Sequence, residues 1–292
     1  MLISQLFLWT TAAIWGFAFV AQTVGMDSLG PYSFNAARFL LATLSLLPLL
    51  FIFKSKQQQD KKHLWLGGIL GGTCLFFGFT FQQVGLQYTT AGNAGFITSM
   101  YIVFVPIVGI LLKHKVESHT WLGIILALIG LYCLTIGPHF NINKGDAIEL
   151  IGTLFWTGHV IIIGYFSRYV SAVPLSIIQF LIATILGTVT AFFTESPALA
   201  DFEMAWWPLV YAGVASSGIA FTLQTLGQRN VSASISALIL SSEAVFALIG
   251  GWLLMNEVLS TRALIGCGFI LLGMIISQWP RQTKAAAAIP VA

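Results

Sequence analysis

Only two charged residues, Arg38 and Glu243, lie well inside the apolar segments of this 292-residue chain, and they are its strongest candidates for chemistry. A charge in so apolar a setting is costly and needs a partner or a water-filled cavity. Glu243 can carry a proton, hold helices together or contact a solute directly. Arg38 can clamp a carboxylate, bind a backbone carbonyl or pair with Glu243. The sequence leaves these roles open.

Aromatic and uncharged polar side chains inside the same segments form a second set of candidates. Trp15 and Trp156 can wall a cavity for an apolar or cationic group, or simply fill volume. His159 shares a helix face with Trp156, although a lone helical histidine is more often a packing residue. The full set expected around a solute cavity is Trp15, Arg38, Gln82, Asn93, Ser99, Tyr101, Trp156, His159, Gln179, Gln224 and Ser241, with Glu243 as a proton-coupling or structural carboxylate. Gln22 and Asn35 supply similar polar groups, and several of these residues are expected only to fasten helices together.

Known catalytic and cofactor motifs are missing from the sequence. It contains no phosphate-binding loop with Lys-Ser/Thr, no His-Glu-x-x-His metal motif and no Gly-x-Ser-x-Gly elbow. Cys74, Cys133 and Cys267 form no Cys-x-x-Cys pair. We therefore expect no catalytic residues, no metal and no cofactor. One alternative remains, a membrane-embedded enzyme built on His159 and Glu243, or a scaffold that transports nothing.

The elements that position these residues follow from composition. Apolar residues make up 57% of the chain and charged residues only 8%, against roughly a quarter in soluble domains. The mean hydropathy of +0.89 predicts an all-α membrane protein, and nothing supports nucleic-acid binding. The first basic residue is Arg38, so we expect that the first helix is not a cleaved signal peptide. Ten segments of spanning length are predicted, at 4–25, 31–53, 64–86, 91–112, 119–137, 146–166, 174–194, 205–226, 231–254 and 261–279.

Charge asymmetry predicts the orientation. With the N-terminus in the cytoplasm, the cytoplasmic side holds Lys54, Lys56, Lys61, Lys62, Lys113, Lys115, Arg168, Arg229, Arg281 and Lys284. The opposite side then carries only Lys144 and Arg262, together with the acidic residues Asp27, Asp146, Glu149, Glu195, Asp201, Glu203 and Glu257. This distribution follows the positive-inside rule, so both termini are predicted to be cytoplasmic.

The two halves of the chain are related. At a shift of 141 residues Trp15 meets Trp156, and 39–43 meets 180–184. Shifts of 142 and 143 bring Gln82 onto Gln224 and the later glycines onto one another. Because each half contains five spans, an odd number, the second copy must insert upside down. We predict a first five-helix repeat over 1–140, an inverted repeat over 141–280 and a disordered cytoplasmic tail over 281–292.

Small residues recur at helix-packing spacing. Gly67, Gly68, Gly71 and Gly72 form two overlapping Gly-x-x-x-Gly patterns, and Gly123 and Gly130 match Gly266 and Gly273. Such patterns let helix backbones approach closely. We expect close-packing surfaces there, and leave open whether the chain is a monomer or a homodimer.

The sequence resembles the ten-helix EamA-type members of the drug/metabolite transporter superfamily over nearly its whole length. The resemblance rests on Trp15-Gly16, on 38–42 and 91–96, and on 232–238, 242–246, 252–257 and 266–273. The chain departs from the family where Ala244, rather than proline, follows Glu243, and where Lys115 replaces an acidic residue. The first departure puts a kink in the ninth helix in doubt.

Together these features predict a secondary transporter for a small organic solute, working by alternating access between the two halves. The resemblance implies metabolites, amino acids or drugs as substrates and, most often, export. One buried carboxyl and one buried arginine favour a net-neutral or zwitterionic solute, with hydrophobic or aromatic amino acids first. A drug or cation carrier and a nucleotide-sugar carrier are the alternatives. The expected location is the inner membrane of a bacterium, with the lipid bilayer as the other partner.

Overall fold

The computed structural model describes residues 2–52, 60–89, 91–113, 116–135, 144–255 and 260–277. The predicted tail 281–292 and Glu257 lie outside these ranges. Within them the chain is helical: α1 (Leu2–Gly25), α2 (Pro31–Leu46), α3 (Leu49–Ile52), α4 (Lys61–Gly85), α5 (Ala91–Ser99), α6 (Tyr101–Leu111), α7 (Ser118–Thr135), α8 (Lys144–Phe166), α9 (Ala172–Thr194), α10 (Leu199–Met204), α11 (Trp206–Val210), η1 (Tyr211–Ala220), α12 (Phe221–Gln228), α13 (Ala233–Leu240), α14 (Glu243–Met255) and α15 (Thr261–Ser277).

Eight of the ten predicted spans are helical stretches long and apolar enough to cross a membrane. The other two, predicted at 119–137 and 261–279, are the shorter apolar helices Ser118–Cys133 and Thr261–Ser277. Large apolar side chains are exposed on these helices and on the longer spans; Phe192 and Phe193 of Ala172–Thr194, for example, are each 79% exposed. In water this surface would be unfavourable, so lipid is the medium that covers it.

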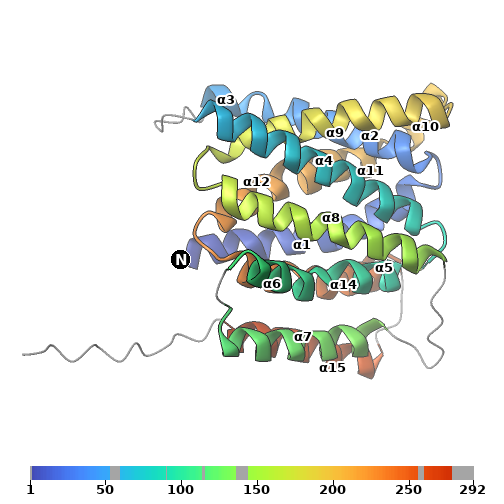
Figure 1. Cartoon of the computed structure of the whole chain (residues 1–292). Coiled ribbons are helices and arrows are strands. Elements are labelled where there is room, and N and C mark those ends of the chain that lie inside the picture. Colours follow the sequence, from blue (N-terminus) through green and yellow to red (C-terminus); the bar gives the residue numbers. More distant parts are fainter. Residues whose placement is uncertain are drawn as a thin grey trace, which may run out of the picture.

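The helices lie side by side along one common direction (Figure 1). At one edge α7 packs on α15, and at the other α2 packs on α9. Contacts between the halves follow the internal repeat. Helix α1 packs on η1 and α12, and its repeat partner α8 packs on α4. Likewise α2 packs on η1, and its repeat partner α9 packs on α4. This exchange of partners is what an approximate two-fold relation between two halves produces.

Two long spans are interrupted at matching positions. One break lies at Met100 between α5 and α6, and the other at Ser241 and Ser242 between α13 and α14. The second break forms although no proline follows Glu243. There Ser241 Oγ donates to the Leu238 carbonyl at 2.8 Å and Ser242 Oγ donates to the Ile239 carbonyl at 2.7 Å, which satisfies carbonyls near the break.

Another irregular element, the π-helix η1, was not expected from the sequence. A π-helix widens the turn and is frequent at functional sites. Its Ser216 carbonyl accepts from Trp15 Nε1 at 3.1 Å, and the Ala220 carbonyl accepts from Thr11 Oγ1 at 3.0 Å. The small residues of η1 therefore let α1 and α2 approach its backbone closely.

The predicted glycine surfaces are close-packing surfaces, and they are internal. A Cβ added at Gly123 would lie 2.5 Å from the Gly273 carbonyl oxygen, and one at Gly130 would lie 2.5 Å from the Gly266 carbonyl oxygen. The glycines of α4 face side chains and backbone of α8 and α9, among them Ile178. Gly67, Gly68, Gly71 and Gly72 of α4 are buried, so their contacts join helices within the chain.

Two acidic side chains near a helix end are buried inside the molecule. Arg38 and Glu243 are buried as expected, being 0% and 4% exposed, but Asp146 and Glu149 in the first turns of α8 are buried as well, at 4% and 0%. Asp146 and Glu149 lie so close to the start of α8 that their position in the sequence suggests exposure to solvent. Packing of α8 against α4 and α5 removes them from the surface.

Candidate functional site

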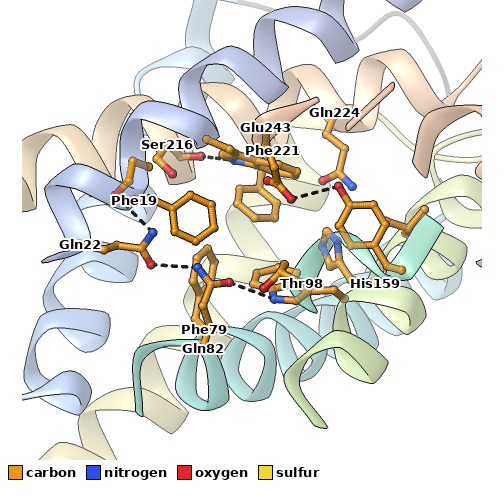
Figure 2. A pocket seen from close by; sticks show the side chains of 15 residues that line it. Phe19, Gln22, Phe79, Gln82, Thr98, His159, Ser216, Phe221, Gln224 and Glu243 are labelled. Carbon is orange, nitrogen blue, oxygen red and sulfur yellow. Dashed lines mark hydrogen bonds between the residues drawn. The ribbon is translucent and has the colours of Figure 1, made fainter. Parts of the chain in front are cut away.

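A small cavity of about 40 Å³ lies where the two halves meet. Figure 2 shows its wall, to which α1, α4, α5, α6, α8, η1, α12 and α14 all contribute. The lining residues are Trp15, Ala18, Phe19, Gln22, Phe79, Gln82, Thr98, Tyr101, Trp156, His159, Val160, Ser216, Phe221, Gln224 and Glu243. No single repeat could form this cavity alone.

Repeat-related aromatic pairs form much of the wall. The rings of Trp15 and Phe221 lie 4.5 Å apart, and the rings of Trp156 and Phe79 lie 4.6 Å apart. The shift of 141 that relates Trp15 to Trp156 is close to the shift of 142 that relates Phe79 to Phe221. Each tryptophan therefore packs on a phenylalanine from the other half of the chain, which gives the cavity a predominantly apolar surface.

At one end of the cavity, around Gln22 and Gln82, the polar groups satisfy one another (Figure 2). Gln82 Nε2 donates to Gln22 Oε1 at 3.3 Å, and Trp156 Nε1 donates to Gln82 Oε1 at 3.2 Å. Arg38 Nη1 donates to the same Gln22 oxygen at 3.2 Å. These bonds connect α1, α2, α4 and α8, so this end has a structural role.

Arg38 lies behind the wall and does not line the cavity. Its Nε donates to Ser217 Oγ and its Nη2 donates to Ser216 Oγ, each at 3.2 Å. Its guanidinium carbon also lies 4.0 Å from the centre of the Phe79 ring. Across the described part of the chain no ion pair joins Arg38 to Glu243, so the pairing considered from the sequence does not form. Neutral oxygens and an aromatic face hold this charge instead.

At the other end, Glu243 meets its repeat partner. Tyr101 OH donates to Glu243 Oε1 at 3.1 Å, and the two residues are 142 positions apart, each directly after a helix break. The bond therefore connects the two interrupted spans near the centre of the molecule. It places a carboxyl group in the cavity wall, between residues of both halves.

Gln224 and His159 lie at the same end as Glu243 (Figure 2). The Gln224 amide has no hydrogen-bond partner among the described residues, although the side chain is 0% exposed. His159 Nε2 lies 2.8 Å from Gln179 Oε1, and its Nδ1 is likewise without a partner in the described ranges. Buried polar groups are normally paired, so these atoms are positioned to bind water or a solute.

The structure sorts the residues selected from the sequence into three groups. Seven line the cavity: Trp15, Gln82, Tyr101, Trp156, His159, Gln224 and Glu243. Arg38 and Gln179 lie behind the wall and bond to lining residues. Ser99 and Ser241 are buried elsewhere, with Ser241 bonded to the backbone of α13, and the side chain of Asn93 lies outside what the structure describes.

Sequence reasoning missed the phenylalanines. Phe19, Phe79 and Phe221 line the cavity, and so do Ala18, Thr98, Val160 and Ser216. Gln22, one of the further polar residues named from the sequence, lines it as well. Phe79 and Phe221 precede the matched pair Thr80 and Thr222, so the internal repeat carried the signal. In an apolar chain, residue type does not distinguish an apolar cavity residue from any other apolar residue. Repetition of the same residue type at the shift that relates the two halves does. In the described part of the chain no cluster of His, Cys, Asp and Glu could hold a metal ion.

Comparisons with known proteins identify the family. The model of the EamA-like transporter family matches twice, at residues 2–136 and 143–278. An uncharacterized transporter of Archaeoglobus fulgidus is 35% identical over 276 residues, which cover 94% of this chain and 85% of that protein. The uncharacterized transporter YoaV of Bacillus subtilis is 22% identical, with 91% and 93% covered.

A known crystal structure shows the same fold. It matches with a TM-score of 0.77 at 16% sequence identity, and the match covers 94% of this chain and 96% of the other. The fold, the duplicated family match and the relatives all agree with the resemblance noted from the sequence. The chain therefore belongs to the EamA-like transporter family, within the drug/metabolite transporter superfamily.

Proposed function

We propose that the chain is a secondary active transporter that exports small organic metabolites by alternating access. The observation that carries this proposal is the central cavity, whose two tryptophan–phenylalanine walls are repeat-related and come from both halves. Two inverted halves around one site can exchange openings to either side of the membrane at similar energy. We also propose ten spans and cytoplasmic termini, as the charge distribution predicts.

The size of the cavity supports a carrier that must change shape. One water occupies roughly 10–15 Å³ on this measure, so about 40 Å³ accommodates a few waters and no amino acid. A solute therefore needs a conformation in which the halves have separated. The breaks at Met100 and at Ser241–Ser242, joined by the Tyr101–Glu243 bond, are suitable hinges for that movement.

The lining favours a solute with an apolar or aromatic body and a few hydrogen-bonding groups. The aromatic walls would hold the body, while the Gln224 amide and the Glu243 carboxyl would bind polar groups at one end. An α-amino group suits this end. Hydrophobic or aromatic amino acids remain our first candidates.

A cationic drug or amine is the second candidate, and the position of Arg38 favours it. A carboxylate clamp was the main argument for amino acids, but this guanidinium is bonded to Gln22, Ser216 and Ser217 behind the wall. Aromatic rings beside a carboxyl group attract cations. A nucleotide-sugar carrier is disfavoured, because the cavity lining contains no Lys or Arg for phosphates.

An enzyme built on His159 and Glu243 has less support than transport. Both residues line the cavity, but His159 Nε2 is engaged by Gln179 and Glu243 Oε1 by Tyr101. We propose a structural and solute-contacting role for His159, and a solute-contacting and proton-coupling role for Glu243. We further propose a bacterial inner membrane as the location and a monomer as the working unit, since the glycine patterns are used inside the chain.

Counterflow in proteoliposomes tests the proposal. Vesicles are loaded with one unlabelled amino acid or amine at a time, and entry of the same labelled compound is followed at equal pH on both sides. Saturable accumulation with aromatic amino acids supports the first candidate, and accumulation with amines alone supports the second. If correctly folded protein accumulates nothing from a broad panel of metabolites and drugs, the transport proposal is wrong.

A further inference from the structure

Glu149 is a second buried carboxyl group, and neither the central cavity nor the sequence motifs account for it. Its side chain is 0% exposed, and its Oε1 has no hydrogen-bond partner within the described ranges. Its Oε2 accepts one long bond, from Thr98 Oγ1 at 3.4 Å. An ionised carboxylate with so little compensation is costly to bury. The group therefore needs a proton or a cation in this conformation.

The position of Glu149 connects one end of α8 to the cavity. Thr98, its hydrogen-bond donor, lines the cavity. Asp146, one turn earlier on α8, is 4% exposed and accepts from Thr89 Oγ1 at 2.5 Å. Asp146, Glu149 and Thr98 thus form a line of polar groups that begins near the start of the helix and ends at the cavity wall.

The groups around Glu149 leave its charge uncompensated. Asp146, on its own helix, is the charged neighbour that acts on it, and it is acidic too. From α4 the neighbour is Gly85, where an added Cβ would lie 2.8 Å from Glu149 Cγ, and from α5 it is the neutral Thr98. In the part of the chain that the structure describes, no Lys or Arg forms an ion pair with Glu149.

The other half of the chain shows that packing does not require this carboxyl. The shift of 141 that relates Trp15 to Trp156 relates Leu8 to Glu149, and Gly227 is the repeat partner of Gly85. Leu8 is 0% exposed and fills the matching place, since a Cβ added at Gly227 would lie 2.7 Å from Leu8 Cγ. A leucine thus serves the same contact in one half that Glu149 serves in the other. We therefore infer that the Glu149 carboxyl serves a chemical role that has no counterpart in the first half of the chain.

We propose that Glu149 is a proton-binding site that relays protons between the solvent at the start of α8 and the central cavity. A proton from water passes by way of Asp146 to the Glu149 carboxylate, and leaves it for cavity water or the Glu243 carboxylate; no covalent bond other than O–H forms or breaks. The relay exists on one side only, because Leu8 replaces it in the other half. This inference rests on the proposed transport function, which it would couple to the proton gradient.

The test combines a transport measurement with a titration that needs no substrate. We would compare wild type with Glu149→Gln, with Glu149→Leu, which copies the other half, and with Glu203→Gln, an exposed carboxyl of α10. Counterflow at equal pH requires no net proton movement and is expected to stay within about twofold in all variants. With one coupled proton, a gradient of about one pH unit supports about tenfold accumulation in wild type and Glu203→Gln, and none in the two Glu149 variants.

Infrared difference spectroscopy supplies the titration. The carbonyl stretch of protonated, dry carboxyl groups is expected in wild type and Glu203→Gln, and the component contributed by Glu149 should be lost in both Glu149 variants. Gradient-driven accumulation unchanged in Glu149→Gln, an unchanged carboxyl band, or accumulation that follows sodium instead of protons would each overturn the proposal. If the wild-type protein shows no counterflow, the transport function fails, while the carboxyl band still decides whether Glu149 binds a proton.

Discussion

At the scale of single residues, the two repeat-related glutamines have diverged. Gln82 uses both ends of its amide, donating to Gln22 and accepting from Trp156. The Gln224 amide is buried and makes no bond to the described part of the protein. Equivalent positions in an ancestral duplication therefore have different tasks: Gln82 holds helices together, and Gln224 offers its amide to the cavity.

This difference predicts opposite phenotypes for the same substitution. Gln82→Leu leaves the Trp156 indole N–H without its acceptor and should lower the free energy of unfolding by about 1–3 kcal/mol. Gln224→Leu should leave stability unchanged or raise it, and should raise the apparent KM for counterflow. Unfolding in detergent and uptake kinetics check both. A Gln224→Leu protein with wild-type KM would remove Gln224 from the solute site.

Glu243 carries the second prediction at this scale. Glu243→Gln keeps a hydrogen-bond acceptor for Tyr101 OH but cannot exchange a proton. We expect counterflow at equal pH to persist with a raised apparent KM, because the amide binds a polar solute group more weakly, and accumulation driven by a pH gradient to be lost. Tyr101→Phe is the matched control, because it breaks the same 3.1 Å bond and leaves the carboxyl in place. If Glu243→Gln responds to the gradient as wild type does, Glu243 is not the coupling group.

At the scale of elements, glycine decides how closely α7 and α15 pack. A Cβ at Gly273 would lie 2.4 Å from the Gly123 carbonyl oxygen, whereas a Cβ at Gly268, on the same helix, meets none of the described atoms within 4 Å. The two backbones therefore touch along one face of α15 only. Close approach of this kind lets helices associate without a hydrophobic force between them.

Replacing these two glycines by alanine should change the free energy of unfolding in opposite directions. Gly273→Ala forces two backbones apart and is expected to cost about 1–3 kcal/mol, as overpacked cores do. Gly268→Ala meets open space and should gain up to about 1 kcal/mol from helix propensity. Unfolding midpoints in detergent measure both. Equal effects of the two substitutions would show that the α7–α15 contact is looser than the structure has it.

At the scale of the whole molecule, the distribution of charge predicts the orientation of the chain in the membrane. Lys62 at the start of α4 and Lys144 at the start of α8 are both exposed, and they lie at opposite ends of the helix bundle. The positive-inside rule assigns the lysine-rich end to the cytoplasm. The relay at Asp146 and Glu149 would then open to the outside, where it could receive the protons that drive export.

Thiol labelling tests this orientation in intact cells. In a background without Cys74, Cys133 and Cys267, Lys144→Cys should react with a membrane-impermeant reagent added outside, and Lys62→Cys should react only after lysis. Reporters fused to either terminus should behave as cytoplasmic. The reverse labelling pattern would invert the predicted orientation and with it the direction of the proposed proton relay.

Hydropathy and internal repetition were enough to predict an all-helical membrane chain and its two related halves. These properties depend on segment length, burial in lipid and matching positions, all of which are local or periodic in the chain. The duplicated family match agrees with them. Gly123, Gly130, Gly266 and Gly273 were also correctly read as packing positions, because a small residue repeated at helix spacing has few other uses.

Tertiary structure alone decided how the buried polar groups pair. Arg38 bonds to Ser217, 179 positions away, and Tyr101 bonds to Glu243, 142 positions away. It also buried the Glu149 side chain inside the molecule, which its position near a helix end did not indicate. Such contacts depend on how the two related halves dock and on the π-helix η1 that lets them approach. Sequence spacing within one helix carries no information about the helix from the other half that packs against it.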